Sequence, residues 1–374
     1  MKIAYLSSAA VPSNSAHSLQ VMKMCQAMQQ EGHAVTLVLP AAADSSQADL
    51  ERMYGVEIRF PILRVDLPRL LGRRGLARAL SDQAERLSPD VVYTRGVDIA
   101  RAAAARKLPA ALEIHALPAG WFGPWYLRML ARNQTVRMIT ISTPLETLLR
   151  KGYPALAQRR ILIAPDAVDL ERYADLPSPQ QARAGLGFPA EGFTAGYFGS
   201  LVAGRGVELI IELAGRLPEV LFLIFGGDAS AVAGWKRRAA DRENLRWMGH
   251  VPNAELPLCQ AACDALLMPY QKSVTIQGKG NTAEIMSPMK LYEYMAAGRL
   301  ILASDLPALR VILNETNSVL LPVETIEPWA AAIEKARRAK AWAGKLAAQA
   351  RKDVQPHTWR NRVRTILEFA RDGG

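Results

Sequence analysis

Short, continuous apolar runs alternate along the chain with longer stretches in which apolar residues recur every three or four positions. The first run, 2–7, predicts a buried strand, and the stretch from Leu19 to Met28 has the spacing of an amphipathic helix. A second run at 34–39 predicts the next strand. Strands separated by helices are typical of a parallel sheet with right-handed crossovers.

The alternation continues to about residue 164. It predicts helices at 75–88, 97–107 and 122–133, and strands at 91–94, 110–114, 137–142 and 160–164. Between 165 and 192 the pattern lapses and prolines accumulate, which indicates a linker.

From 194 the alternation restarts. It predicts strands at 194–199, 220–225, 245–248, 264–268, 300–303 and 318–321, with helices at 205–216, 229–240, 288–297, 307–313 and 326–351. After a break at 355–357, Trp359 begins a last amphipathic helix. We therefore predict two doubly wound α/β domains, 1–165 and 193–354, a linker at 166–192, and a C-terminal helix, 355–374, that belongs with the first domain.

Composition is that of a globular protein: of 374 residues, 50% are hydrophobic and 22% charged. The net charge of +11 suggests a nucleic-acid-binding protein, but the basic residues are scattered and form no nucleic-acid recognition helix. Anionic substrates and an anionic lipid surface are the expected partners instead.

The three cysteines, Cys25, Cys259 and Cys263, do not have the spacing of a disulfide framework or a zinc site. Cys259 and Cys263 are expected on one helix as core thiols. The N-terminus lacks an apolar signal core, and no apolar run reaches 18 residues. We expect a cytoplasmic protein, with peripheral contact at the inner face of a membrane as an option.

The stretch 287–298 combines groups that bind anions and diols. Ser287 is a good N-cap, Pro288 suits the first helical position, and Gly298 ends the helix. Free N–H groups at the helix start and Lys290 suit a phosphate, whereas Glu293 suits ribose hydroxyls. An ordinary capped helix with a surface ion pair has the same sequence pattern.

Two glycine-containing turns follow strands of the second domain. Residues 197–207 bring Arg205 to a helix start, where its guanidinium suits a phosphate pair. Residues 225–228 end the next strand in the same way, with Gly227 in the turn. Neither turn matches a dinucleotide or P-loop pattern, and purely structural turns are the alternative.

In the first domain, His115 comes just past the end of a strand, Glu113 alternates with it, and Arg95 follows the neighbouring strand. Ligands of open α/β sheets gather at that edge, so the three side chains are candidates to line one crevice. A structural role for a lone histidine is the alternative.

The segment 121–126 is rich in aromatic residues, which suits either core packing or a wall for an apolar or sugar-bearing acceptor. Upstream, arginines interleave with leucines in a basic amphipathic pattern: Arg69, Arg73, Arg74 and Arg78. Such a pattern suits an anionic membrane surface, although a solvated helix face looks similar.

With these residues in place, the chain resembles the retaining glycosyltransferases of family four over nearly its full length, most strongly at 194–322. The resemblance implies the GT-B fold, in which two Rossmann-like domains face each other across a cleft. It implies a nucleoside diphosphate sugar as donor, a hydroxyl acceptor, retention of anomeric configuration, and no cofactor or metal. A lipid-linked or surface-polysaccharide precursor is the expected acceptor.

The resemblance also assigns roles to residues. It places Glu293 on the ribose, Arg205 on the diphosphate, Val251 against the base, and His115 near the transferred sugar. Lys290 is added to the diphosphate group because of its charge. The rest of the donor side comprises Ser200, Gly227, Ser287, Pro288, Met289 and Leu291, and the acceptor side comprises Ser15, Arg95 and Trp121.

Three positions depart from the family pattern. The first motif glutamate is Ile285, with Glu284 one position away, and an arginine usual after the first glycine is Ser200. The usually glycine-rich first loop is Pro12–Ala16. A nucleotide-sugar epimerase and a non-catalytic nucleotide-sugar-binding protein therefore remain as alternatives. A dehydrogenase is disfavoured because the first strand lacks the required glycine pattern.

Overall fold

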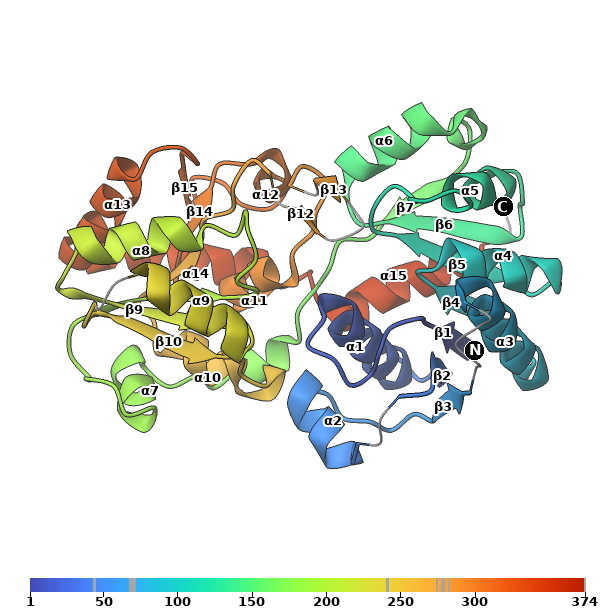
Figure 1. The fold of residues 1–374 in the computed structure, drawn as a ribbon, viewed down its shortest axis with the longest axis horizontal. Helices are drawn as coiled ribbons and strands as arrows, with labels where there is room; N and C mark the ends of the chain where they lie inside the picture. Colours follow the sequence, from blue (N-terminus) through green and yellow to red (C-terminus); the bar gives the residue numbers. More distant parts are fainter. Residues whose placement is uncertain are drawn as a thin grey trace. The chain divides into compact units, whose positions relative to one another are not determined.

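The computed structural model describes residues 1–42, 45–66, 72–239, 242–273, 275–276, 280–281 and 283–372. The chain divides into two compact units (Figure 1). Unit 1 comprises Met1–Asp166 and Trp359–Gly374, and unit 2 comprises Ala167–Thr358. The segment 166–192, expected as a linker, falls almost wholly in unit 2 and holds the short helices η3 (Leu170–Tyr173) and α7 (Pro179–Gly185).

Unit 1 is built on a parallel sheet with the strand order β3-β2-β1-β4-β5-β6-β7. Its strands are β1 (Lys2–Leu6), β2 (Ala34–Pro40), β3 (Ile62–Val65), β4 (Val91–Thr94), β5 (Ala110–Ile114), β6 (Val136–Thr140) and β7 (Ile161–Ile163). The order reverses between β1 and β4. Such a reversal is the place where open α/β sheets bind ligands.

The helices of unit 1 cover both faces of this sheet (Figure 1). They are α1 (Ala16–Gln30), α2 (Gln47–Tyr54), α3 (Gly72–Leu87), α4 (Val97–Ala105), α5 (Gly123–Ala131), α6 (Thr143–Gly152) and α15 (Trp359–Arg371). The connection through α1 runs from β1 toward the β3 edge of the sheet, whereas those through α3, α4 and α5 run toward the β7 edge. Because such crossovers are right-handed, α1 lies on one face of the sheet and α3, α4 and α5 lie on the other. The C-terminal helix α15 packs on α1.

Unit 2 repeats the design with the order β10-β9-β8-β11-β14-β15. Its strands are β8 (Phe193–Phe198), β9 (Val220–Phe225), β10 (Leu245–Gly249), β11 (Ala265–Met268), β14 (Leu300–Ser304) and β15 (Val319–Leu321), and a small hairpin is formed by β12 (Thr275–Ile276) and β13 (Gly280–Asn281). The order reverses between β8 and β11.

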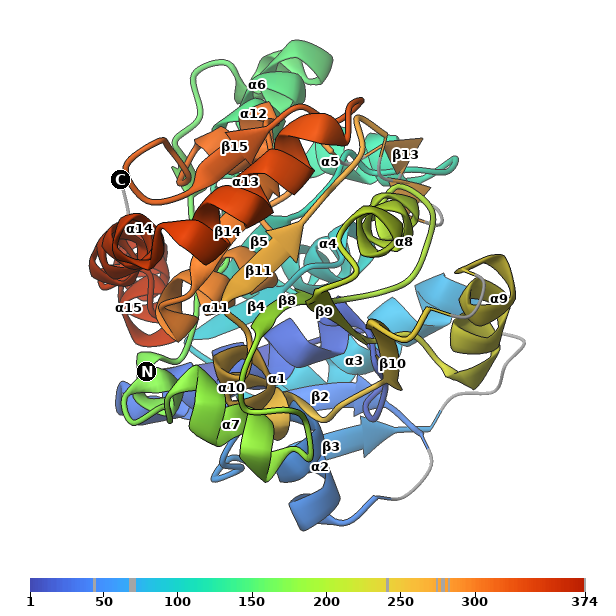
Figure 2. The same cartoon turned by 90° about the vertical axis from the view of Figure 1, so that its left-hand side faces the viewer.

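The helices of unit 2 also form a layer on each face of the sheet (Figure 2). They are α8 (Val207–Arg216), α9 (Ala229–Ala239), α10 (Leu256–Ala261), α11 (Met289–Ala297), α12 (Pro307–Arg310), α13 (Glu327–Arg338) and α14 (Lys340–Asp353). Successive residues of one strand enter different cores: Phe222 packs with α8 and α13, whereas Leu223 packs with α11 and α14. A strand buried on both faces reads as one apolar run, which is why these strands were predictable. The prediction of two doubly wound α/β sheets is confirmed.

Two helix predictions were wrong. The single helix expected at 326–351 is two helices, because Ala339 leaves helical geometry (φ −115°, ψ 63°) between α13 and α14. Cys263 does not share a helix with Cys259, since α10 ends at Ala261, although both thiols are buried as expected. The sequence analysis also missed α2, α6 and α7, which are short and mostly exposed. None of the helices in the described part of the chain combines the length and apolar composition needed to span a membrane.

Candidate functional site

The first candidate site lies in unit 2, at the carboxyl ends of β8 and β11, where the strand order reverses. The loop after β8 runs from Gly199 to Gly206, and the chain after β11 passes through Tyr270. The two segments are joined by a hydrogen bond from the Gln271 N–H to the Gly204 carbonyl (2.9 Å). Both therefore border the crevice in which this fold class binds ligands.

Glycines let the backbone segments around this crevice approach closely. Gly226 has φ +125°, and a Cβ there would lie 1.9 Å from the Gly199 carbonyl oxygen. Gly206 has φ +78°, and a Cβ there would lie 1.8 Å from the Pro269 carbonyl oxygen. At both positions the obstacle is backbone, which cannot move aside as a side chain can, so only glycine fits.

Lys290 of α11 points its ammonium into this site. The Nζ is buried and lies 4.2 Å from the ring centre of Tyr197 and 5.1 Å from that of Tyr270. A Cβ on Gly199 would come within 2.3 Å of the Nζ, so the ammonium sits against that loop. Among the described residues, no hydrogen-bond partner is available to the Nζ. Burial, and then the nearby charge of Arg205, hold the pKa of Lys290 well below its usual range, while Glu293 opposes them.

Arg205 supplies a second cation beside the first. Its guanidinium lies 4.8 Å from the ring centre of Tyr270, the same ring whose centre lies 5.1 Å from the Lys290 ammonium. Within the described part of the chain, its buried Nε also has no hydrogen-bond partner. Two neighbouring buried cations with unsatisfied donors repel each other unless an anion lies between them. The sequence analysis selected both residues, and the structure brings them together.

The start of α11 differs from the expectation. The helix begins at Met289 with Pro288 as N-cap residue, and no side chain caps it. Ser287, predicted as the N-cap, instead has its hydroxyl 3.4 Å from that of Tyr292. Among the described residues no side chain caps this helix N-terminus, where the Leu291 N–H donates to the Pro288 carbonyl (2.9 Å). A helix N-terminus of this kind suits an anion. Gly298 ends the helix in the left-handed conformation (φ 62°), as predicted.

Glu293 lies one turn beyond Lys290 on the same helix. The Asn253 amide donates to its carboxylate (3.4 Å), and Arg172 donates to the Asn253 side chain (2.6 Å). Ile285, at the position of the first motif glutamate, is buried, whereas the neighbouring Glu284 is exposed. Glu284 is therefore on the surface, unlike the buried Ile285 beside it.

The other donor-side candidates have simple surroundings. Leu291 is buried in the core, and Val251 packs against that core from its edge. Gly227 has φ +73° and sits against Leu201. Ser200 is exposed, and its carbonyl accepts a hydrogen bond from the hydroxyl of Tyr197 (2.8 Å). These residues shape the loop around Lys290 and Arg205.

A second candidate site lies in unit 1, at the carboxyl ends of β4 and β5 beside the strand-order reversal. Its centre is the carboxylate of Glu113, which is fully buried. The carboxylate accepts hydrogen bonds from Gln20 (2.6 Å) and Tyr93, and it contacts His115 and Arg362 (2.9 Å). Arg95 joins this group of buried side chains through Gln20, whose amide oxygen accepts from Arg95 (2.8 Å).

Burial and charge separate the protonation states in this cluster. Burial alone would raise the pKa of Glu113, but Arg362 and His115 lower it to about 2. Burial and the nearby Arg95 lower the pKa of His115 to about 3. At neutral pH Glu113 is thus ionised and His115 neutral. Because His115 Nε2 faces the carboxylate, its proton sits on Nε2 and Nδ1 is left as an acceptor.

Two acceptor-side candidates lie elsewhere. Ser15 is exposed and its hydroxyl caps α1 by accepting from the Ser18 N–H (3.1 Å). Trp121 is 96% exposed, which excludes the core-packing interpretation for this residue. Neither of them touches the Glu113 cluster. Arg69 lies outside the described residues.

Several cluster members were missed by the sequence analysis. In the Glu113 cluster, Gln20 lies within the predicted helix of residues Leu19–Met28, and Arg362 comes from the C-terminal helix. Around Lys290, Tyr197 and Tyr270 have the sequence pattern of ordinary core aromatics. A weak signal existed for Arg362, because it interrupts the apolar side of α15 and is buried there.

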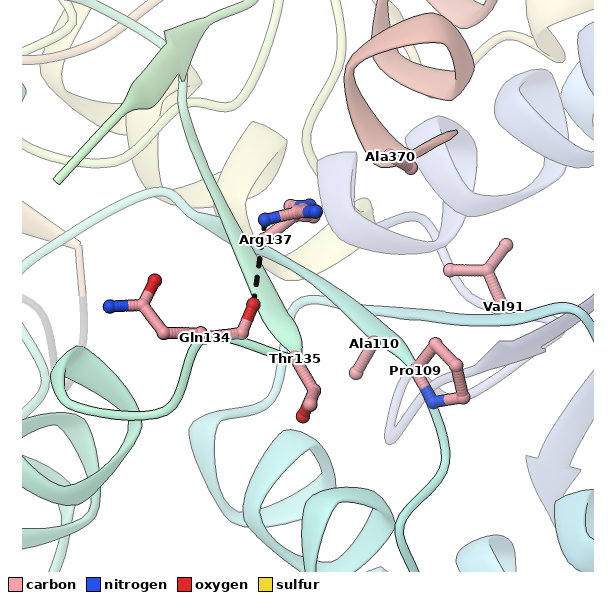
Figure 3. A pocket seen from close by; sticks show the side chains of 7 residues that line it. All are labelled: Val91, Pro109, Ala110, Gln134, Thr135, Arg137 and Ala370. Atoms are coloured by element: carbon pink, nitrogen blue, oxygen red, sulfur yellow. Dashed lines mark hydrogen bonds between the residues drawn. The ribbon is translucent and has the colours of Figure 1, made fainter. Parts of the chain in front are cut away.

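A pocket of about 370 Å³ opens at the other end of the unit 1 sheet (Figure 3). It is lined by residues at the amino ends of β4, β5 and β6, and by Ala370 of α15. Arg137 there donates to the Gln134 carbonyl (3.4 Å). The pocket lies away from the carboxyl edge and contains none of the candidate residues, so we do not assign it to the functional site.

Two family models match the chain. Residues 18–172 match the model described as glycosyltransferase family 4, and residues 192–338 match the model described as glycosyl transferases group 1. The two matches follow one another and together take in most of both units.

Curated relatives match part of the chain. The phosphatidyl-myo-inositol mannosyltransferase of Mycobacterium tuberculosis is 30% identical over 178 residues, which are 46% of this chain and 44% of that protein. The 2-deoxystreptamine glucosyltransferase of Streptomyces kanamyceticus is 32% identical over 139 residues, 35% of each chain. The matched region thus spans less than half the length of each relative.

Solved structures match the whole fold. The Anabaena HepE protein in complex with UDP has a TM-score of 0.74 at 18% identity, with 98% of this chain and 99% of that chain covered. The lipopolysaccharide outer core galactosyltransferase WaaB has a TM-score of 0.66 at 15% identity, with 99% of each chain covered. The consecutive family matches and the doubly wound architecture agree: the chain belongs to glycosyltransferase family four and has the GT-B fold.

Proposed function

We propose that this protein transfers a sugar from a nucleoside diphosphate sugar to a hydroxyl acceptor and retains the anomeric configuration. The observation that carries the proposal is the unsatisfied Lys290 ammonium beside Arg205, at the strand-order reversal of unit 2. A diphosphate supplies the negative charge that both cations lack. The relatives that match part of this chain are named as sugar transferases, which supports this reading.

The donor would be held by unit 2. Lys290, Arg205 and the uncapped N-terminus of α11, from Ser287 to Leu291, would bind the diphosphate. Glu293 would accept hydrogen bonds from the ribose, and Val251 would lie against the base. Negative charge grows on the diphosphate as the sugar leaves, so fixed cations and N–H groups stabilise the transition state more than the ground state. We propose that these protein groups meet the charge without a metal or cofactor.

The acceptor side would be carried by unit 1. His115 is neutral at physiological pH, so it would act as a hydrogen-bonding group and not as a general acid. Arg95 would contact an acidic or hydroxyl-rich acceptor. Since the described residues offer no obvious pair of carboxylates for double displacement, we favour front-face substitution, in which the departing phosphate takes the proton of the acceptor hydroxyl. A lipid-linked saccharide is the acceptor class that we favour.

Two other functions fit the same donor site. An epimerase would convert the free nucleotide sugar, and a non-catalytic binding protein would bind it without turnover; Ile285 in place of a glutamate is the feature that favours the latter. Product analysis separates the three. Transfer requires an acceptor, epimerisation proceeds without one, and a binding protein forms no product in either case.

The first experiment is a thermal-shift panel of uridine, guanosine and adenosine diphosphate sugars. A ligand at about 100 times its dissociation constant should stabilise the protein by about 2.7 kcal/mol. Arg205→Met should remove most of this shift. Arg246→Met is the matched control, because Arg246 is an exposed arginine of β10. If no nucleotide sugar shifts the melting temperature of the wild type, the proposed function is wrong.

A further inference from the structure

The strongest feature outside the two candidate sites is an apolar ridge at the start of α5. Five large apolar side chains within residues 117–129 are exposed: Leu117 (42%), Trp121 (96%), Phe122 (50%), Trp125 (48%) and Met129 (44%). Soluble surfaces tolerate single exposed apolar residues, but a contiguous group of this size marks an interaction site. On α5, Trp125 and Met129 are one turn apart and therefore share a side of the helix.

Arginines surround this ridge on three neighbouring helices. The guanidinium of Arg74 lies 3.5 Å from the ring centre of Phe122, and that of Arg101 lies 4.9 Å from that of Tyr126. The exposed Arg128 and Arg132 come from α5 and its C-terminus. Helix α3 packs on α4 and α4 on α5 (Figure 1), so these arginines come from neighbouring helices. We call these residues together the aromatic–arginine face.

The charge on the α5 side of this face is of one sign. Between Glu113 and Glu146 the sequence contains no acidic residue. Acidic partners do occur on the α3 side, where Arg73 lies 3.5 Å from Asp98 and Arg78 lies 3.9 Å from Asp82. Arg128 and Arg132, like the exposed tryptophans, therefore lie on a segment that carries no acidic residue of its own.

We propose that the aromatic–arginine face docks this protein onto a lipid bilayer that contains anionic lipids. Tryptophan and phenylalanine side chains favour the headgroup region, where the ring is buried and the polar edge stays hydrated. Arginines at the same level bind lipid phosphates. An apolar ridge bordered by arginines, with acidic partners only on its α3 side, matches such a surface in both hydrophobicity and charge.

The face differs from what a protein partner would need. A stable protein interface has an apolar centre with a rim that contains both signs of charge, whereas the α5 side of this face contains arginines alone. Its most exposed side chain, Trp121, protrudes from the surface, as suits insertion into a soft headgroup layer. Docking of this kind does not depend on the proposed sugar transfer.

The test is co-sedimentation of the full chain with vesicles of phosphatidylcholine alone and with phosphatidylglycerol as a third of the lipid. Neither nucleotide nor acceptor is present, so the outcome is separate from that of the proposed function. We expect binding to the anionic vesicles that weakens with added salt, and a blue shift of tryptophan emission. Arg128→Gln and Arg132→Gln should each lower the partition coefficient about fivefold.

The double variant Trp121→Ser, Trp125→Ser should lower binding at least tenfold while its circular dichroism stays that of the wild type. Val311→Ser is the apolar control, because Val311 is 51% exposed on unit 2, and Arg338→Gln is the charge control. The proposal is overturned if the wild type binds anionic vesicles no better than neutral ones, or if the double variant binds as the wild type does. Self-association through this face, without vesicle binding, would equally overturn it.

Discussion

The ammonium of Lys290 lies 4.2 Å from the ring centre of Tyr197, and the described part of the protein offers that Nζ no hydrogen-bond partner. The ring face stabilises a cation, but by much less than hydration does. An anion is therefore the kind of ligand that this site favours. This one relationship predicts both a stability cost in the free protein and an affinity for phosphate groups.

Lys290→Met should stabilise the ligand-free protein by about 1 kcal/mol or more at pH 7, because an apolar side chain of similar length has no charge to desolvate. Burial and Arg205 lower the pKa of Lys290 in the folded state, so above this depressed pKa the unfolded chain binds more protons. The free energy of unfolding of the wild type therefore increases as pH rises toward the unfolded lysine pKa of about 10.4. The stability difference between Lys290→Met and the wild type becomes smaller over the same pH range. Urea denaturation at pH 7 and 9 measures this stability difference between the variant and the wild type. The exposed Lys345→Met serves as control, and an equal gain there would refute the assignment.

Nucleotide binding should be accompanied by proton uptake. A bound diphosphate favours the charged form of Lys290, so binding should be accompanied by net proton uptake and affinity should fall as pH rises. Calorimetry with UDP in phosphate and in Tris buffer, whose ionisation enthalpies differ, gives the number of protons. Lys290→Met should bind more weakly and without uptake. Uptake that persists in the variant would assign the proton to another group.

Gly226→Ala should destabilise the protein by more than about 2 kcal/mol and weaken nucleotide binding, since the new Cβ would lie 1.9 Å from the Gly199 carbonyl oxygen. Gly234→Ala is the matched control: Gly234 is inside α9 and nothing lies within 4 Å of its added Cβ. That variant should gain about 0.5–1 kcal/mol of stability. Urea midpoints compare the two, and equal effects would contradict the close approach seen here.

Arg362→Met should cost about 3–5 kcal/mol, because it leaves the buried carboxylate of Glu113 without its nearest cation. Arg360→Met, two positions away on α15, removes a partly exposed pair with Glu31 and should cost less than about 1 kcal/mol. Thermal melts at pH 7 compare the variants. A small loss for Arg362→Met would mean that Glu113 is neutral in the folded protein.

Asp166→Asn should stabilise the protein at pH 7.5 but not at pH 4. Burial, and then the ionised Glu113, raise the pKa of Asp166 to about 6, against the opposing charges of Arg362 and Arg95. Because the pKa of Asp166 is higher in the folded than in the unfolded protein, the protonated carboxyl stabilises the fold fully below the unfolded pKa of about 3.9. This stabilisation is lost as pH rises through about 6. The asparagine variant keeps the uncharged form throughout. Melting temperatures at the two pH values test this, with the exposed Asp175→Asn expected to change little at either.

Much of the fold was predictable because its signal is local. A parallel strand buried on both faces is an apolar run, and each helix carries its own period, so β1, β4, β5 and β9 were found nearly to the residue. The break at Ala339 was not, since the sequence there shows neither glycine nor proline. The prediction that Ser287 caps α11 was also wrong. N-cap propensity favours serine, but in the structure its hydroxyl lies beside that of Tyr292.

The sequence by itself determined which residues can form buried strands, where glycine loops follow them, and that Lys290, Arg205, Glu113 and His115 come at strand or helix ends. Local periodicity carries this information. Only the tertiary structure decided their partners. Arg362 meets Glu113 across 249 positions of the chain because α15 packs on α1, and Tyr197 and Tyr270 enclose Lys290 because β8 and β11 are neighbours. Burial and charge depend on such distant contacts, which no local pattern encodes.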